Sequence, residues 1–104
     1  MGADVTISGL AARRTGGLSA GARNAAVVHL TATIARLAGR DGITANTVHP
    51  GLTVTERLDE TWAPRIEMEE ARASIGRLVT AEEVAAVIAF LASDAAACIS
   101  GESI

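Results

Sequence analysis

The sequence contains no tyrosine, a single cysteine and very few aromatic residues, which make up 2% of its 104 positions. Without tyrosine, no phenol is available as a proton donor. One cysteine, Cys98, cannot form an intrachain disulfide or a cysteine metal cluster, and it fits a reduced, cytoplasmic setting. No apolar run approaches the length of a membrane span, so we expect no membrane partner.

Charge is also scarce, and the net charge of −3 is mild. A chain that binds a phosphate backbone as its main activity carries a basic excess, so we expect no nucleic-acid partner. The two histidines, His29 and His49, lie far apart with no carboxylate or cysteine at ligand spacing. We therefore expect no metal site.

Hydrophobic residues make up 49% of the chain, and most of them are alanine, valine, isoleucine and leucine. Small side chains of this kind pack helices close to a sheet or to another helix. The length fits one domain or a part of one. The composition therefore predicts an ordered chain with one modest core.

Two short apolar stretches flank a long helical pattern. Residues 4–8 alternate between apolar and polar side chains and predict a strand, and residues 9–21 read as a loop. A helix is expected over Ala20–Ala38 and a buried strand over Ile43–Val48. Strand, helix and strand with short joins form a parallel, right-handed βαβ unit, so we expect a partial Rossmann-like α/β fold with a doubly wound parallel sheet.

The Ile43–Val48 strand is stopped by Pro50 and Gly51, because proline supplies no amide to a ladder and glycine allows a sharp redirection. Ligands of open α/β sheets bind just beyond the carboxyl ends of strands. Thr53 and Thr55 follow at alternate positions and offer hydroxyls and amides to such a ligand. The alternative is that these threonines cap the next helix.

The Ala20–Ala38 helix is apolar most of the way round, whereas a surface helix has a single apolar stripe. It needs two partners, its own sheet and a helix of another subunit. We therefore expect a homo-oligomer formed through this helix.

The last part of the chain carries a polar stretch, a helix and the start of another strand. Residues 55–74 predict a short helix with Pro64 in its first turn, either a mobile cover over the strand end or a plain surface helix. Thr80 and Glu83 form a capping box that begins a helix. Ile99–Ile104 reads as the approach to a further strand.

Several stretches, in order, resemble the C-terminal half of the short-chain dehydrogenase/reductase family. They are Asn24-Ala25-Ala26-Val27, Gly42 to Gly51 with its Pro-Gly loop, Ile75-Gly76-Arg77-Leu78, Glu82-Glu83-Val84-Ala85, Phe90-Leu91-Ala92-Ser93-Asp94 and Ile99-Ser100-Gly101. Each match is weak alone, but together they span nearly the whole chain. The resemblance implies that residues 1–104 form a single C-terminal portion of a Rossmann-fold oxidoreductase domain.

In that family the Pro-Gly loop closes over the nicotinamide end of NAD or NADP. The resemblance implies nicotinamide contacts from Pro50, Gly51, the Thr53 backbone and the Thr55 hydroxyl. The family's Gly-rich turn is absent, and the sequence has no G-x-G-x-x-G. Without that turn no helix N-terminus receives the pyrophosphate, so dinucleotide affinity should collapse.

The family's catalytic tyrosine and lysine are replaced by Ala20 and Asn24. Neutral Asn24 can hydrogen-bond a ribose but cannot lower a pKa as the lysine does. Ser8 lies near the position of the family's catalytic serine. Arg23 is either a substitute cation or a solvent or interface charge, and His49 either faces the nicotinamide crevice or is a satisfied histidine at a strand end.

Our leading hypothesis is a divergent member of this family whose intact form transfers hydride between NAD(P) and a small carbonyl or alcohol substrate. We expect the isolated chain to be inactive, because it has half a cofactor site and no tyrosine. The alternative is a non-catalytic oligomerisation or interaction module derived from that fold. A further hypothesis is that the reading frame extends upstream of Met1.

Overall fold

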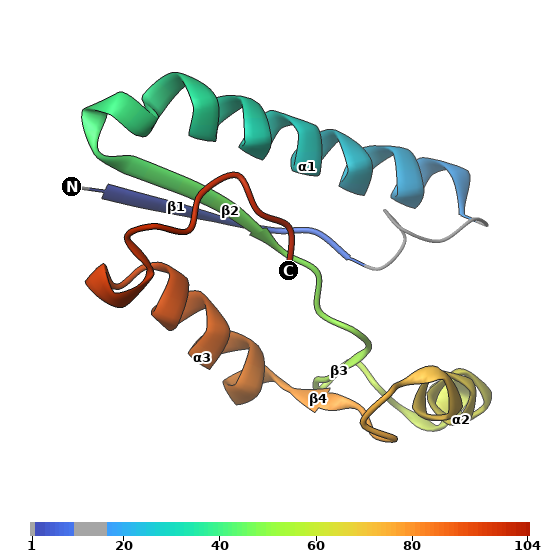
Figure 1. Cartoon of the computed structure of the whole chain (residues 1–104). Coiled ribbons are helices and arrows are strands. Elements are labelled where there is room, and N and C mark those ends of the chain that lie inside the picture. The colour runs from blue at the N-terminus through green and yellow to red at the C-terminus, as the bar shows by residue number, and fades with distance from the viewer. Residues whose placement is uncertain (1, 10–16) are drawn as a thin grey trace.

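The computed structural model describes residues 2–9 and 17–104. The elements follow in the order β1 (Gly2–Ile7), α1 (Leu18–Ala38), β2 (Ile43–Val48), β3 (Thr53–Val54), α2 (Ala63–Arg72), β4 (Val79–Thr80) and α3 (Ala81–Leu91). Figure 1 shows α1 over one face of β1 and β2, α3 on the other face, and α2 set apart from both. The α/β class and the partial Rossmann-like architecture are confirmed.

The central pair of strands is parallel, with Gly2 opposite Ile43 and Ile7 opposite Val48. The expected βαβ unit is therefore present. The chain's last residues run along the other edge of β2, where the amide of Thr47 donates to Glu102 O (2.8 Å) and the amide of Ile104 donates to Thr47 O (2.9 Å). The sequence predicted the approach to a further strand over Ile99–Ile104, and the structure has an isolated parallel bridge there, between Thr47 and Ser103.

Helix α1 is joined to the sheet by a chain of threonine hydroxyls. The Oγ1 atom of Thr6 lies 2.8 Å from that of Thr31 and 3.0 Å from that of Thr47. Thr31, which is 1% exposed, donates its own proton to Val27 O at 2.8 Å. These bonds connect α1, β1 and β2 without leaving a buried hydroxyl unpaired, which would cost about 1–3 kcal/mol.

The opposite face of the sheet carries the apolar core. Val48, Leu91 and Ala96 are buried there, and three half-buried side chains pack against them: Val5, Ile88 and Ile99. All of these side chains are small or aliphatic, in keeping with the low aromatic content. Helix α3 is therefore held to β2 by close packing of aliphatic groups.

Two boundaries differ from the sequence predictions. The loop predicted over residues 9–21 ends earlier, because α1 begins at Leu18 and the Gly21 amide donates to Gly17 O at 2.9 Å. Strand β1 begins at Gly2, whose amide donates to Gly42 O at 3.2 Å. In both places a glycine backbone makes the regular hydrogen bond although glycine has a low propensity for helix or strand. The remaining part of that loop, Leu10–Gly16, lies outside the described residues.

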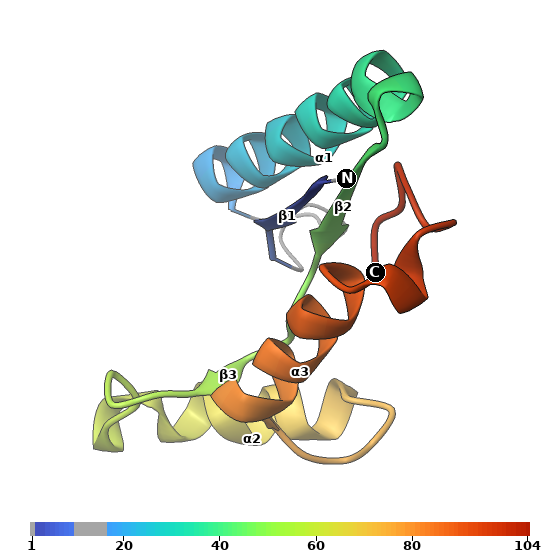
Figure 2. The same cartoon turned by 90° about the vertical axis from the view of Figure 1, so that its left-hand side faces the viewer.

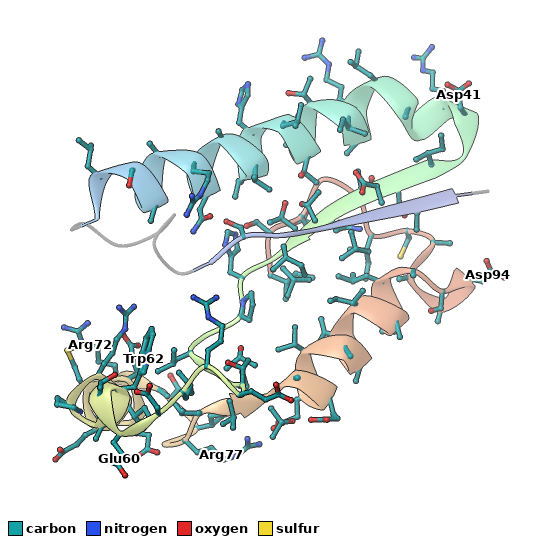
Figure 3. All side chains as sticks on the ribbon, turned by 180° about the vertical axis from the view of Figure 1, so that it is seen from behind. Asp41, Glu60, Trp62, Arg72, Arg77 and Asp94 are labelled. Carbon is teal, nitrogen blue, oxygen red and sulfur yellow. The ribbon has the colours of Figure 1, made fainter. Side chains whose placement is uncertain are left out.

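Gly42 makes the corner between α1 and β2. Its φ of 76° lies in the left-handed region, and its amide donates to Gly39 O after the short turn Gly39–Asp41. Glycine adopts this conformation without steric cost, so the chain reverses in very few residues. Figure 3 shows Asp41 at this corner and Asp94 at the same end of the molecule.

Residues 53–80 form an outlying arm, which Figure 2 shows projecting from the sheet. Its two short strands pair in parallel, with Thr53 opposite Val79. Its helix, α2, has Pro64 in the first turn, as predicted. The arm carries the loop that follows Pro50-Gly51, so its position shapes the space beyond the carboxyl end of β2.

Candidate functional site

The carboxyl ends of β1 and β2 bring together Ser8 and Asn24, which the sequence had singled out. The Ser8 hydroxyl donates to the backbone carbonyl of Asn24 at 3.1 Å. A Cβ on Gly9 would lie 3.1 Å from the Asn24 side-chain nitrogen, so the amide packs directly over this glycine. The end of β1 and the second turn of α1 are therefore in contact at the point where parallel strands bind ligands.

Ala20 lies one turn before Asn24 on α1 and is half-buried, whereas Arg23 is exposed. A methyl group at Ala20 cannot exchange a proton. Ser8 has committed its own proton to the Asn24 carbonyl, so its oxygen remains as an acceptor. These residues can hold and orient a polar group but contain no acid or base of suitable pKa.

His49 is 7% exposed and ties three strand ends together. Its Nδ1 lies 3.3 Å from Gly9 O, and its Nε2 is hydrogen-bonded to the Ser103 hydroxyl. A carbonyl oxygen only accepts, so Nδ1 carries the proton and Nε2 accepts from Ser103. Of the two interpretations of His49, the satisfied strand-end histidine is the one that the structure shows.

The Pro50-Gly51 loop leads into β3, and its two threonines behave differently. The Thr53 hydroxyl donates to Gly51 O at 3.0 Å and braces the loop. No residue that the structure describes bonds the hydroxyl of Thr55, which is exposed. The alternative interpretation, in which these threonines cap the next helix, is wrong, because Asp59 accepts from the Thr61 amide and caps that turn.

Thr55 borders an open groove of about 600 Å³ between the loop and the start of α3. Polar and charged residues predominate in its lining, which consists of Val54, Thr55, Glu56, Arg57, Thr80, Ala81 and Glu82, although their apolar atoms contribute much of its surface. One guanidinium and two carboxylates therefore line this groove beside a hydroxyl that no described residue bonds. The groove can receive a neutral polar group such as an amide through hydrogen bonds.

The far wall of the groove is held by the capping box that the sequence predicted. The Glu83 amide donates to Thr80 Oγ1, and the Thr80 amide donates to Glu83 Oε1, both at 3.1 Å. Arg77 adds two parallel bonds of 2.8 Å to the same carboxylate. These bonds, above all those from Arg77, lower the pKa of Glu83 to about 2.

Sequence reasoning missed Asn46 and Ser103. Asn46 is fully buried in β2, donates to Ile99 O at 2.9 Å and accepts from the Glu102 amide at 3.1 Å. The available signal was an amide side chain inside a strand of otherwise buried residues, since such a group needs fixed partners. Nothing in the sequence pattern pairs Ser103 with His49.

In the part of the chain that the structure describes, no group of histidine, cysteine or acidic side chains is arranged to hold a metal ion. Over the same residues, no helix has the length and apolar character of a membrane span.

Residues 2–104 match the family described as enoyl-(acyl carrier protein) reductase. The chain is 43% identical over 84 residues to meso-2,3-butanediol dehydrogenase of Serratia marcescens, a match that covers 80% of this chain and 33% of that protein. It is 37% identical over 83 residues to 3-oxoacyl-[acyl-carrier-protein] reductase of Pseudomonas aeruginosa, covering 80% of this chain and 34% of that protein.

Among solved structures, a Beutenbergia cavernae protein described as an NAD(P)-dependent gluconate 5-dehydrogenase matches with a TM-score of 0.89 and 31% identity. It was solved with bound NADP at low occupancy, and the match covers 98% of this chain and 43% of that one. Parallel strands between helices, with a polar loop at their carboxyl ends, define an α/β protein of the Rossmann type. The chain belongs to the short-chain dehydrogenase/reductase family. It spans about a third of the length of these two curated relatives.

Proposed function

We propose that this chain forms the nicotinamide side of an NAD(P)-dependent oxidoreductase site that acts on a small carbonyl or alcohol substrate. The observation that carries the proposal is the contact of Ser8 with Asn24 at the carboxyl end of β1, together with the Pro50–Thr55 loop that follows the carboxyl end of β2. A reducing, cytoplasmic compartment belongs to the same proposal, because Cys98 is free and exposed.

The residues present fit one end of the dinucleotide. Thr55 offers beside the groove a hydroxyl that no residue in the described ranges bonds, and Thr53 braces the loop through Gly51, so an amide such as a carboxamide can be bound there. When bound, the cofactor supplies the hydride. This chain's residues would hold and orient the cofactor. Asn24 presents a neutral amide, and Ser8 keeps the end of β1 against α1.

The chain alone lacks two parts of a working site. The sequence has no G-x-G-x-x-G turn to bind the pyrophosphate, and it has no tyrosine to donate a proton. A general acid typically contributes a factor of about 10²–10⁴ to a rate. The isolated chain is therefore inactive in this proposal, and activity belongs to a larger assembly.

Nicotinamide absorbance, followed with the purified chain and a panel of small carbonyl compounds, tests the inactivity. Turnover of NADPH or NADH above the buffer rate would overturn it. Saturation-transfer NMR with NADP tests the binding. Weak contacts confined to the nicotinamide protons, lost in Thr55→Val and kept in Thr61→Val, are the expected result, and contacts insensitive to Thr55→Val would remove the site.

The second part of the proposal is self-association through α1, the feature that favours an interaction module. The outward face of α1 carries Leu18, which is 88% exposed, and the exposed alanines Ala22, Ala25 and Ala26. Small side chains let two helices approach closely, so a second copy of α1 fits this face. Light scattering should report a dimer that Ala22→Glu dissociates and that Ala71→Glu, on exposed α2, leaves intact. A monomeric parent chain would contradict it.

A further inference from the structure

Another cavity lies at the end of the sheet where β1 and β2 begin, away from the Pro50–Thr55 loop. Its volume is about 240 Å³, and its walls come from the starts of both strands, the last turn of α1 and the segment that follows α3. A strand of this length spans about 20 Å, so the cavity is separate from the nicotinamide side of the sheet. Its lining includes Gly2, Ala35, Gly39, Ile43, Asp94 and Cys98.

The size of this cavity limits what it can hold. Glycine and alanine make up much of its wall, and a Cβ on Gly39 would meet no atom within 4 Å. The volume is well above the roughly 10–15 Å³ that one water molecule needs and below the roughly 300–1,000 Å³ of sites for drug-sized molecules. The cavity therefore fits a ligand of only a few heavy atoms.

The fold uses some of the polar side chains in the cavity and leaves others over. The Ser93 hydroxyl donates to a backbone carbonyl of α3 at 2.6 Å, and the Ser100 hydroxyl accepts from the Ala45 amide at 3.1 Å. None of the described residues bonds the Asp94 carboxylate or the Thr44 hydroxyl. A ligand that donates hydrogen bonds would therefore meet a carboxylate and a hydroxyl oxygen that the fold does not use.

The charges around the cavity favour a cation. The last turn of α1 and the residues directly after α3 both line it, and the carboxyl end of a helix carries a partial negative charge. Among the described residues that line the cavity, only Asp94 is charged, and Figure 3 shows it at the same end of the molecule as Asp41. Arg36 and Arg40, near the end of α1, do not line the cavity.

We propose that this cavity binds a small organic cation, an alkylammonium compound whose charged group lies at Asp94 and whose short carbon chain packs on the alanine and glycine walls. A metal ion is the weaker occupant, because the described residues hold no group of three histidine, cysteine or acidic side chains. An anion would meet a carboxylate and two helix ends of its own sign. The proposal does not depend on the proposed function, which concerns the other end of the sheet.

Cys98 provides an anchor for the test, because its thiol is free and exposed and it lines the cavity. The full chain is equilibrated with cystamine in a thiol buffer, and mass spectrometry measures the adduct. The Cys98 thiolate attacks one sulfur of cystamine, forms a mixed disulfide and displaces cysteamine as a thiolate, which takes up a proton. Bis(2-hydroxyethyl) disulfide is the neutral probe of similar length, and the same pair on the urea-unfolded chain corrects for the chemistry of the probes.

The cationic adduct is expected to exceed the neutral one by about threefold to tenfold after this correction. Asp94→Asn should remove most of the preference, and it should leave the melting temperature unchanged because no described residue bonds this carboxylate. Glu60→Gln, on the exposed arm, is the matched control and should keep the preference. If both variants change it equally, the preference reflects the net negative charge of the chain and the proposal is wrong.

A second measurement needs no covalent bond. Butylammonium chloride is titrated into the chain, and NMR shifts are followed at the amides of Ala35, Gly39 and Ser93, with 1-butanol as the neutral comparison. Saturable shifts with butylammonium alone are expected. Ala97→Leu narrows the cavity and should abolish them, whereas Ala95→Leu, exposed and outside the lining, should not. No saturable shift with butylammonium, or equal binding of 1-butanol, would overturn the proposal.

Discussion

The sheet with its two helices and the outlying arm are stabilised in different ways. Around β2, the buried residues are Ala45, Asn46, Thr47, Val48 and His49, and α1 and α3 each add one more. In the arm, Val54, Met68 and Ile75 are 51%, 42% and 61% exposed, and α2 buries only Glu69. The sheet is held by burial, whereas the arm is held by local polar contacts.

The arm's local contacts can be named one by one. Asp59 caps the turn before α2, Arg65 lies 5.6 Å from the centre of the Trp62 ring, and Arg77 pairs with Glu83. Figure 3 shows Trp62 and Arg72 together at α2, with Arg77 nearer to α3. Contacts of this kind fix short segments but add little global stability. The difference teaches that the strand ends are fixed by burial, whereas the arm, which supplies much of the groove's lining, is fixed by exposed polar contacts.

The largest difference in stability between the sheet and the arm is expected when a buried leucine is removed from the sheet. Leu91→Ala should lower the free energy of unfolding by about 2–5 kcal/mol, because Leu91 is 1% exposed and its loss leaves a cavity beside Val48. Ile75→Ala in the arm should cost less than about 0.5–1 kcal/mol. Urea denaturation followed by circular dichroism measures both. Equal losses would mean that the arm is as tightly packed as the sheet.

Removing the buried amide of Asn46 tests the same difference in stability between the sheet and the arm. Asn46→Ala leaves Ile99 O and the Glu102 amide without their partner, so we expect a loss of about 1–3 kcal/mol. Hydrogen exchange should speed up at Gly101 and Ile104, whose amides bond β2. The matched change in the arm, Asp59→Ala, removes an exposed cap and should cost about 1 kcal/mol or less. A smaller loss for Asn46→Ala than for Asp59→Ala would reverse this order.

The smallest effect is a pH dependence at the start of α3. The pKa of Glu83 is about 2, held below its ordinary value of 4.5 mainly by the hydrogen bonds from Arg77. A lowered pKa in the folded state means that this stabilisation is present above about 4.5 and is lost as the pH falls toward 2. Glu83→Gln should therefore flatten the acid limb of the stability curve in that range. Glu82→Gln on the same turn is the control, and an unchanged acid limb in Glu83→Gln would contradict the assignment.

The sequence predicted the elements whose cause is local. Ile43–Val48 is a buried strand ended by proline, and Thr80 with Glu83 is a capping box, and both stand where they were expected. The parallel pairing followed from the short joins. The convergence of Ser8 with Asn24 followed from the family resemblance, and their roles remain a proposal.

What the sequence did not predict depends on contacts between distant residues. His49 bonds Gly9 and Ser103, and Asn46 bonds Ile99, partners that no spacing rule relates. The early start of α1 depends on one backbone bond between Gly17 and Gly21, where side-chain propensity argues for a loop. These hydrogen-bond partners and the start of α1 therefore depend on tertiary structure, which the local sequence pattern does not reveal.

The threonine hydroxyls under α1 have a fixed sense. Because the Thr31 hydroxyl donates its proton to Val27 O, Thr6 must donate to Thr31, and Thr47 must in turn donate to Thr6. The three protons point one way, from the middle strand toward the helix axis. Their exchange with solvent should be slow enough for separate NMR resonances. The exchange rates of these three hydroxyl protons would then report how tightly α1 packs against the sheet.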